Sequence, residues 1–177
     1  METIAKFEKV SLEQFTRDWV EKFPVSDSEK DIPLTRILDE IRGIYDSIEL
    51  PRRGTKGSAA YDFFAPIAIE LDPGASVFFP TGIRVKIDMP YALVCLPRSG
   101  QGTKYKLRLA NTIGLIDPDY YNADNEGHIM AKICNEGNEP LRIDNGKAFM
   151  QAMFLPFGIA EEEEVTDERK GGFGSTG

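Results

Sequence analysis

The segment LRLANTIGLIDPDYYNADNEGHIMAKI, residues 107–133, carries the pattern that decides the fold class. Apolar side chains recur at every second position in its first three and its last five residues, as in strands with one buried face. Between them lie Asp117, Pro118 and Asp119, residue types that are common in turns. We therefore predict strands joined by a polar connection, and no long helix, in this segment.

The same period of two extends over the chain from Glu49 onward. Residues 67–71 and 83–87 alternate in the same way, whereas residues 91–96 and 148–155 are almost wholly apolar, as in strands covered on both faces. Many short strands separated by turn residues favour a β-barrel or a jelly roll over βαβ units. The predicted fold class is therefore mainly β.

Residues 11–48 follow a helical period instead. Ser11 and Gln14 form a candidate capping box in front of an apolar stripe. Asp31 is predicted to cap a second helix that has Pro33 in its first turn. We expect two short amphipathic helices that pack on the β core.

Composition excludes several classes of function. The chain of 177 residues has 21 basic and 29 acidic side chains, a net charge of −8, which disfavours binding to nucleic acids or acidic membranes. No apolar run approaches the roughly 20 residues of a membrane span, and the charged N-terminus does not resemble an export signal, so a cytoplasmic location is predicted. Cys95 and Cys134 are predicted to be reduced, buried thiols. The single histidine, His128, excludes most histidine-based catalytic and zinc sites.

Three short motifs allow two interpretations each. PRSG, residues 97–100, is either a strand-ending turn or a phosphate clamp built on Arg98. Asp117, at the end of an apolar run, is either a turn residue or a carboxylate that accepts a proton from water. GGFGSTG, residues 171–177, is either a disordered chain end or an arm that folds over a ligand.

The order of the motifs favours the functional interpretation. GSAAYD (57–62), PRSG (97–100), NTIGLIDPDY (111–120), GKAFMQ (146–151) and GGFGSTG (171–177) resemble the five ordered motifs of the trimeric dUTP pyrophosphatase (dUTPase) family. The resemblance covers about residues 51–177, and residues 4–10 match the first strand of that family. It implies a jelly-roll-like β-barrel of the dUTPase type that forms a homotrimer.

The resemblance also implies a reaction and its residues. Proteins of this kind convert dUTP and water into dUMP and pyrophosphate with Mg²⁺, which keeps uracil out of DNA and supplies dUMP for thymidylate synthesis. Asp117 would be the catalytic base, and Asp62 would reach Mg²⁺ through water. The implied contacts to uracil and deoxyribose come from Asn111, Gly114, Ile116, Tyr120, Met130 and Phe173. The implied contacts to the phosphates come from Arg98, Ser99, Gly100, Gln151, Arg169, Gly174, Ser175 and Thr176.

The chain departs from the family pattern at several places. Ala148 stands where an arginine is usual, a loss for which Lys147 could compensate, and residues 121–126 look inserted. His128 is predicted to be exposed and structural. We expect one domain over residues 1–177, with residues 11–48 as a helical insertion and residues 158–177 as a flexible arm that closes the active site.

Two alternatives stay open on the sequence alone. One is a dCTP deaminase-like enzyme of the same fold family. The other is a regulatory module that keeps the nucleotide site but engages a protein partner through residues 11–48 or 121–126.

Overall fold

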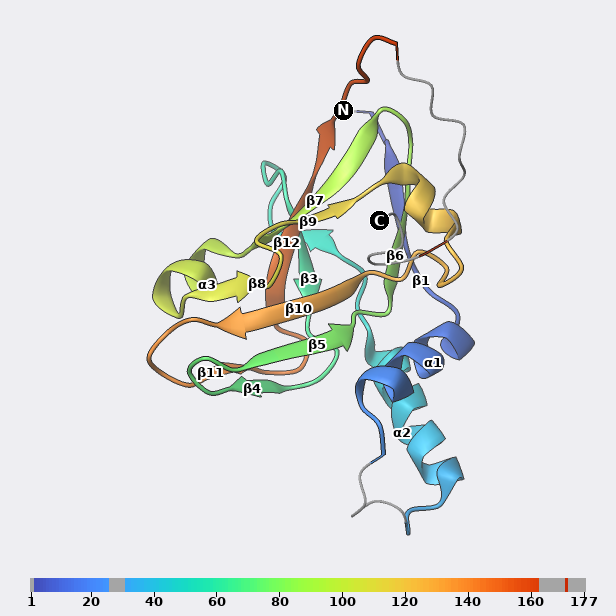
Figure 1. Ribbon diagram of the computed structural model, residues 1–177, viewed down its shortest axis with the longest axis vertical. Coiled ribbons are helices and arrows are strands. Elements are labelled where there is room, and N and C mark those ends of the chain that lie inside the picture. Colours follow the sequence, from blue (N-terminus) through green and yellow to red (C-terminus); the bar gives the residue numbers. More distant parts are fainter. Residues whose placement is uncertain (1, 26–30, 163–170, 172–177) are drawn as a thin grey trace.

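The structure is a computed structural model that describes residues 2–25, 31–162 and 171. Strands make up most of the described elements, and the two longer helices lie together at one end of the molecule (Figure 1). In chain order the elements are β1 (Ala5–Lys9), α1 (Leu12–Lys22), α2 (Leu34–Ser47), β2 (Arg52–Arg53), β3 (Tyr61–Phe64), β4 (Ile69–Leu71), β5 (Ser76–Pro80), β6 (Ile83–Ile87), β7 (Tyr91–Pro97), α3 (Ser99–Lys104), β8 (Leu107–Leu109), β9 (Gly114–Ile116), the 3₁₀ helix η2 (Pro118–Asn122), β10 (Met130–Asn135), β11 (Leu141–Ile143) and β12 (Ala148–Pro156).

The strands form antiparallel sheets whose apolar faces meet in one core. Within the described ranges there are four sheets, with strand orders β2-β3-β12-β7-β9, β5-β10-β8, β1-β6 and β11-β4. Phe79 on β5 and Phe149 on β12 join the two largest sheets, with ring centroids 5.1 Å apart. The predicted mainly β, jelly-roll-like fold is confirmed, although the strands do not close into one continuous barrel.

The helical segment begins as predicted at its first helix but not at its second. Ser11 is the N-cap of α1, and its Oγ accepts a hydrogen bond from the Gln14 N–H at 3.0 Å. The Gln14 side chain does not complete the capping box, because its Nε2 donates to Asp18 instead. Asp31 does not cap α2, whose N-cap is Pro33. A cap at Asp31 would make Ile32 the first helical residue. A proline disfavours helical backbone in the residue before it, so Ile32 cannot readily take that place.

Helix α1 packs its aromatic side chains into the same core as the strands. Phe15 is fully buried, and its ring centroid lies 5.3 Å from that of Trp19 and 5.6 Å from that of Tyr45 on α2. Its ring also lies 6.1 Å from His128, which is 0% exposed. The prediction that His128 is exposed is therefore wrong, because the inserted helix covers it. None of the helices in the described ranges is long and apolar enough to span a bilayer.

Truncation of Phe15 tests whether the helices share the β core. We expect Phe15→Ala to lower the free energy of unfolding by about 3–5 kcal/mol, because a large buried ring is replaced by a cavity. Chemical denaturation followed by circular dichroism measures this loss. Val20→Ala on the same helix is the control, since Val20 is 40% exposed and should cost far less. Equal losses in the two variants would contradict the shared core.

Candidate active site

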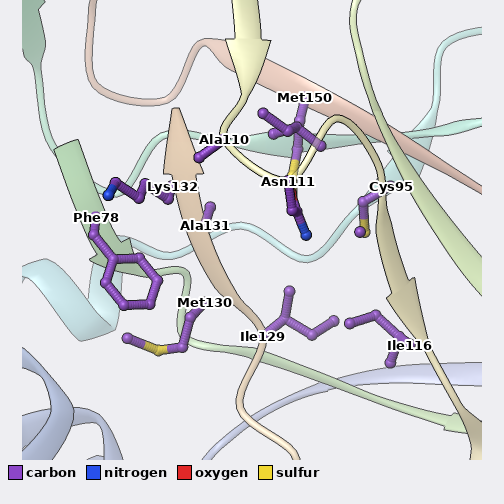
Figure 2. Close-up of a pocket in the computed structure, with 12 residues that line it drawn as sticks. Phe78, Cys95, Ala110, Asn111, Ile116, Ile129, Met130, Ala131, Lys132 and Met150 are labelled. Atoms are coloured by element: carbon purple, nitrogen blue, oxygen red, sulfur yellow. The ribbon is translucent and has the colours of Figure 1, made fainter. Parts of the chain in front are cut away.

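An apolar cavity of about 210 Å³ lies between the β8–β9 turn and strand β10 (Figure 2). It brings together four residues that the sequence analysis assigned to one site: Asn111, Gly114, Ile116 and Met130. The rest of the lining comes from neighbouring strands and consists of Phe78, Cys95, Leu109, Ala110, Ile129, Ala131, Lys132 and Met150. The cavity can therefore accept a small flat ring with few polar groups.

The β8–β9 turn is tight and held by backbone hydrogen bonds. The Ala110 N–H donates to the carbonyl of Lys132 on β10 at 2.9 Å, and the Thr112 N–H donates to the Leu109 carbonyl at 2.9 Å. Thr112 itself has a positive φ of 69°. In Figure 2 the Asn111 side chain points toward the middle of the cavity, so its amide supplies both a donor and an acceptor within apolar walls.

Gly114 lies where β9 approaches β7 closely. A Cβ atom built on Gly114 would lie 3.2 Å from the Cβ of Cys95. Cys95 is buried on β7 and forms one wall of the cavity, and burial raises the pKa of its thiol to about 12. The wall beside Asn111 is therefore uncharged near neutral pH.

Asp117 directly follows the last residue of β9 and does not line the apolar cavity. The residue is the N-cap of η2, is partly buried, and its carbonyl accepts a hydrogen bond from the Tyr120 N–H at 3.2 Å. It lines a separate hollow of about 530 Å³ together with Met89, Pro118, Asp119 and Phe157. Neither Asp117 nor the buried Tyr120 lines the apolar cavity, so a single chain does not bring the predicted base and the predicted ring pocket into one depression.

The predicted phosphate-binding residues that the structure describes lie where β7, β12 and β3 run side by side. The strand register places Gln151 opposite Asp62 on one side and opposite Leu96 on the other. The Gln151 Nε2 donates to the Pro97 carbonyl at 3.1 Å, just before Arg98, which precedes Ser99 and Gly100 at the start of α3. This edge therefore gathers residues from three of the predicted motifs.

Arg98 and Asp62 form an ion pair at this edge. The distance from Arg98 Nε to Asp62 Oδ1 is 2.9 Å, and both side chains are partly exposed. A search of the described residues finds no group of three or more His, Cys, Asp or Glu side chains that could hold a metal ion. A single carboxylate suits Mg²⁺, which keeps much of its water and commonly binds proteins together with substrate phosphates.

The backbone at Ala148 takes contacts that the sequence analysis did not foresee. Its carbonyl accepts hydrogen bonds from Arg98 Nη1 at 3.4 Å and from Gln101 Nε2 at 3.0 Å. Lys147 is exposed and makes no such contact there. The sequence analysis did not assign Cys95 to the cavity, although its position two residues before Pro97 in an almost wholly apolar segment could have indicated it. Gln101 carried no comparable signal.

Five residues predicted to belong to the site come from the C-terminal arm. Arg169, Phe173, Gly174, Ser175 and Thr176 lie outside the described residues.

Comparison with known proteins gives one consistent family. A model of the dUTPase family matches residues 46–177. The deoxyuridine 5′-triphosphate nucleotidohydrolase of Citrobacter koseri is 41% identical over 150 residues, covering 80% of this chain and 94% of that protein. The enzyme of the same name from Lactococcus lactis is 39% identical over 133 residues, covering 73% and 89%. Among solved structures, dUTPase from Streptococcus mutans matches with a TM-score of 0.58 at 34% identity, covering 66% of this chain and 91% of that one.

Cys95 is buried as predicted, whereas Cys134 is only partly buried, so we expect the Cys95 thiol to be unreactive in the folded protein. In a Cys134→Ser variant we expect a thiol reagent at pH 8 to leave the folded protein unlabelled, because a thiol with a pKa of about 12 has almost no thiolate at that pH. Unfolding in denaturant should expose one reactive thiol per chain. A colorimetric disulfide-exchange assay measures both states, and fast labelling of the folded variant would contradict the closed wall.

Proposed function

Because the chain belongs to the dUTPase family, we propose that it hydrolyses dUTP to dUMP and pyrophosphate, with Asp117 as the catalytic base. The observation that carries the proposal is the apolar cavity of about 210 Å³ lined by Asn111, Gly114, Ile116 and Met130, which supports a small ring such as uracil as its occupant. The curated relatives are nucleotidohydrolases, so a dCTP deaminase-like activity is not favoured.

Uracil would enter the cavity edge-on at the β8–β9 turn. The Asn111 amide and the backbone groups near Gly114 and Met130 would pair with the donor and acceptors of the uracil edge. Cytosine would present an amino group where uracil presents an oxygen, so the same partners would be mismatched. The short turn and the Cys95 wall would leave little room for the 5-methyl group of thymine.

Asp117 would activate the water that attacks the α-phosphorus. The water oxygen forms a bond to that phosphorus, the bond to the oxygen that bridges to the β-phosphate breaks, and pyrophosphate leaves. The proton of the water would pass to the Asp117 carboxylate, which is held at the start of η2. Tyr120 would lie under the deoxyribose.

The edge around Arg98 would bind the phosphates. Arg98, Ser99, Gly100 and Gln151 would contact phosphate oxygens, and the Arg98 guanidinium has the planar fork that suits them. Mg²⁺ on the triphosphate would neutralise part of its charge, and Asp62 would hold the ion through water. The net charge of −8 is compatible with this, because the cations at the site are local.

A homotrimer would complete the site. Met89 and Phe157 line the hollow beside Asp117 and are 65% and 38% exposed, and Leu115 on the same side of β9 is 60% exposed. Large apolar side chains gathered near a catalytic carboxylate are typical of an interface between subunits. Such an interface would place Asp117 of one subunit near the uracil pocket of another.

We also retain the predicted arm and the cytoplasmic location as parts of the proposal. Residues 158–177 would close over the bound nucleotide, with Phe173 stacked on uracil and Arg169, Gly174, Ser175 and Thr176 on the γ-phosphate. Residues 1–177 would form one domain in which the helices of residues 11–48 are an insertion.

Nucleotide selectivity tests the proposed substrate. With Mg²⁺ present, we expect dUTP to be hydrolysed with a kcat/KM at least about 100-fold above those of dTTP and dCTP, because the cavity pairs only with the uracil edge. Pyrophosphate release measures all three rates, and an ammonia assay with dCTP should stay at background. Equal rates for the three nucleotides would contradict the proposal.

Replacement of Asp117 tests the proposed base. We expect Asp117→Asn to lower kcat by about 10²–10⁴-fold with little change in KM, because the amide cannot take the proton from water. Asp124→Asn is the matched control, since Asp124 is an exposed aspartate seven residues further along the same connection. Steady-state kinetics give kcat and KM for both variants. Normal turnover by Asp117→Asn would show that another residue is the base.

A further inference from the structure

A buried polar network joins helix α1 to the β9–β10 connection, which we define as residues 117–129. Asp18 on α1 is 9% exposed, and its Oδ2 lies 2.5 Å from Nδ1 of the fully buried His128. The same Oδ2 accepts a hydrogen bond from Gln14 Nε2 at 2.9 Å. The proposed chemistry uses none of these three side chains.

The two nitrogens of the His128 ring have defined roles. The Gly82 N–H donates to Nε2 at 2.7 Å, so Nε2 is an acceptor and carries no proton. The ring proton therefore lies on Nδ1 and is donated to the Asp18 carboxylate. A hydrogen bond to a charged acceptor is stronger than one between neutral groups, so Asp18 holds the ring in one tautomer and one orientation.

His128 in turn holds Tyr120. The Tyr120 hydroxyl donates to the backbone carbonyl of His128 at 2.7 Å and accepts a hydrogen bond from Asn125 Nδ2 at 2.8 Å. At the other end of η2, the Tyr120 N–H donates to the Asp117 carbonyl. A continuous set of contacts thus leads from α1 to the two residues on which the proposed reaction depends.

Further contacts hold the connection on both sides of this network. Ser11, the N-cap of α1, donates from its backbone N–H and its Oγ to the Glu126 carboxylate, at 2.8 and 2.6 Å. Arg84 donates to the Tyr121 carbonyl at 2.7 Å and stacks on the Tyr121 ring, with 3.7 Å between the guanidinium carbon and the ring centroid. Hydrogen bonds therefore tie residues 121–126 to the start of α1 and to strand β6.

The network costs desolvation energy that simple packing would not require. Burial alone would raise the pKa of Asp18, but hydrogen bonds from His128 and Gln14 lower it below its ordinary value of 3.8, so the carboxylate is ionised near neutral pH. Apolar side chains would fill the same space without a buried charge. Unlike apolar side chains, directional hydrogen bonds fix the orientation of the groups that they join.

We propose that Asp18 is a positioning residue for sugar selection, which acts through His128 to fix Tyr120 and so excludes ribonucleotides. This inference rests on the proposed function, in which Tyr120 lies under the deoxyribose. Tyr120 is 3% exposed and is held by hydrogen bonds from both its hydroxyl and its backbone N–H, so the position of its ring depends on these contacts.

The test compares kcat/KM for dUTP and UTP in Asp18→Ala, Asp18→Asn and the wild type. Partial unfolding lowers both values by the same factor, so the ratio of the two reports positioning and not stability. We expect Asp18→Ala to lower the dUTP-to-UTP ratio about tenfold, since small displacements at a site have effects of this order. Asp18→Asn keeps an acceptor oxygen for Nδ1 and should give an intermediate ratio.

Glu21→Ala is the matched control on the same helix, because the Glu21 side chain is 64% exposed and pairs with Lys22; its ratio should equal that of the wild type. An unchanged ratio in Asp18→Ala overturns the inference. If that variant does not fold, an unchanged ratio in Asp18→Asn overturns it equally. A wild type that does not hydrolyse dUTP refutes the proposed function instead, so the two failures are distinguishable.

Discussion

The close pairing of β9 with β7 is the constraint on which the rest of the site depends. A Cβ atom at Gly114 would make a tight contact of 3.2 Å with the Cβ of Cys95, so glycine eases the close approach of the two strands. Alternation then directs Ile116 toward the cavity and Leu115 outward. Asp117 follows at the end of the strand, on a side where one chain alone offers no ring pocket. Pocket and carboxylate are thus separated by the geometry of a three-residue strand.

At the proposed phosphate-binding residues, two opposite charges neutralise each other. Asp62 and Arg98 pair with each other at 2.9 Å, and both side chains keep contact with solvent. Such a partly exposed pair contributes little to stability, so in the proposed function Arg98 and Asp62 would separate at low cost to contact phosphate oxygens and a hydrated metal ion. The Ala148 carbonyl accepts hydrogen bonds from Arg98 and Gln101 and so helps to hold both side chains in place.

The strands could be predicted from the sequence because alternation depends only on which face of a strand is buried. The alternating segments at residues 83–87 and 107–109 correspond to β6 and β8. Predictions failed where distant segments decide the outcome. The residues next to His128 in the sequence are typical of an exposed loop, and His128 is buried because α1 packs against it. Asp31 is a good helix cap by type, but the backbone preference imposed by Pro33 takes precedence. The assignment of strands to separate sheets also depends on pairings that no local pattern encodes.

The way Phe15 and Trp19 enter the core has a practical consequence for anyone who wishes to shorten this protein. The helices are not an appendage that can be cut away, because their excision would uncover His128 and the apolar surface that Phe15 now fills. A truncated chain would expose that surface to solvent and tend to aggregate. Conversely, grafting the helices onto a shorter relative would require a matching hollow in the recipient, so the two parts have to be redesigned together.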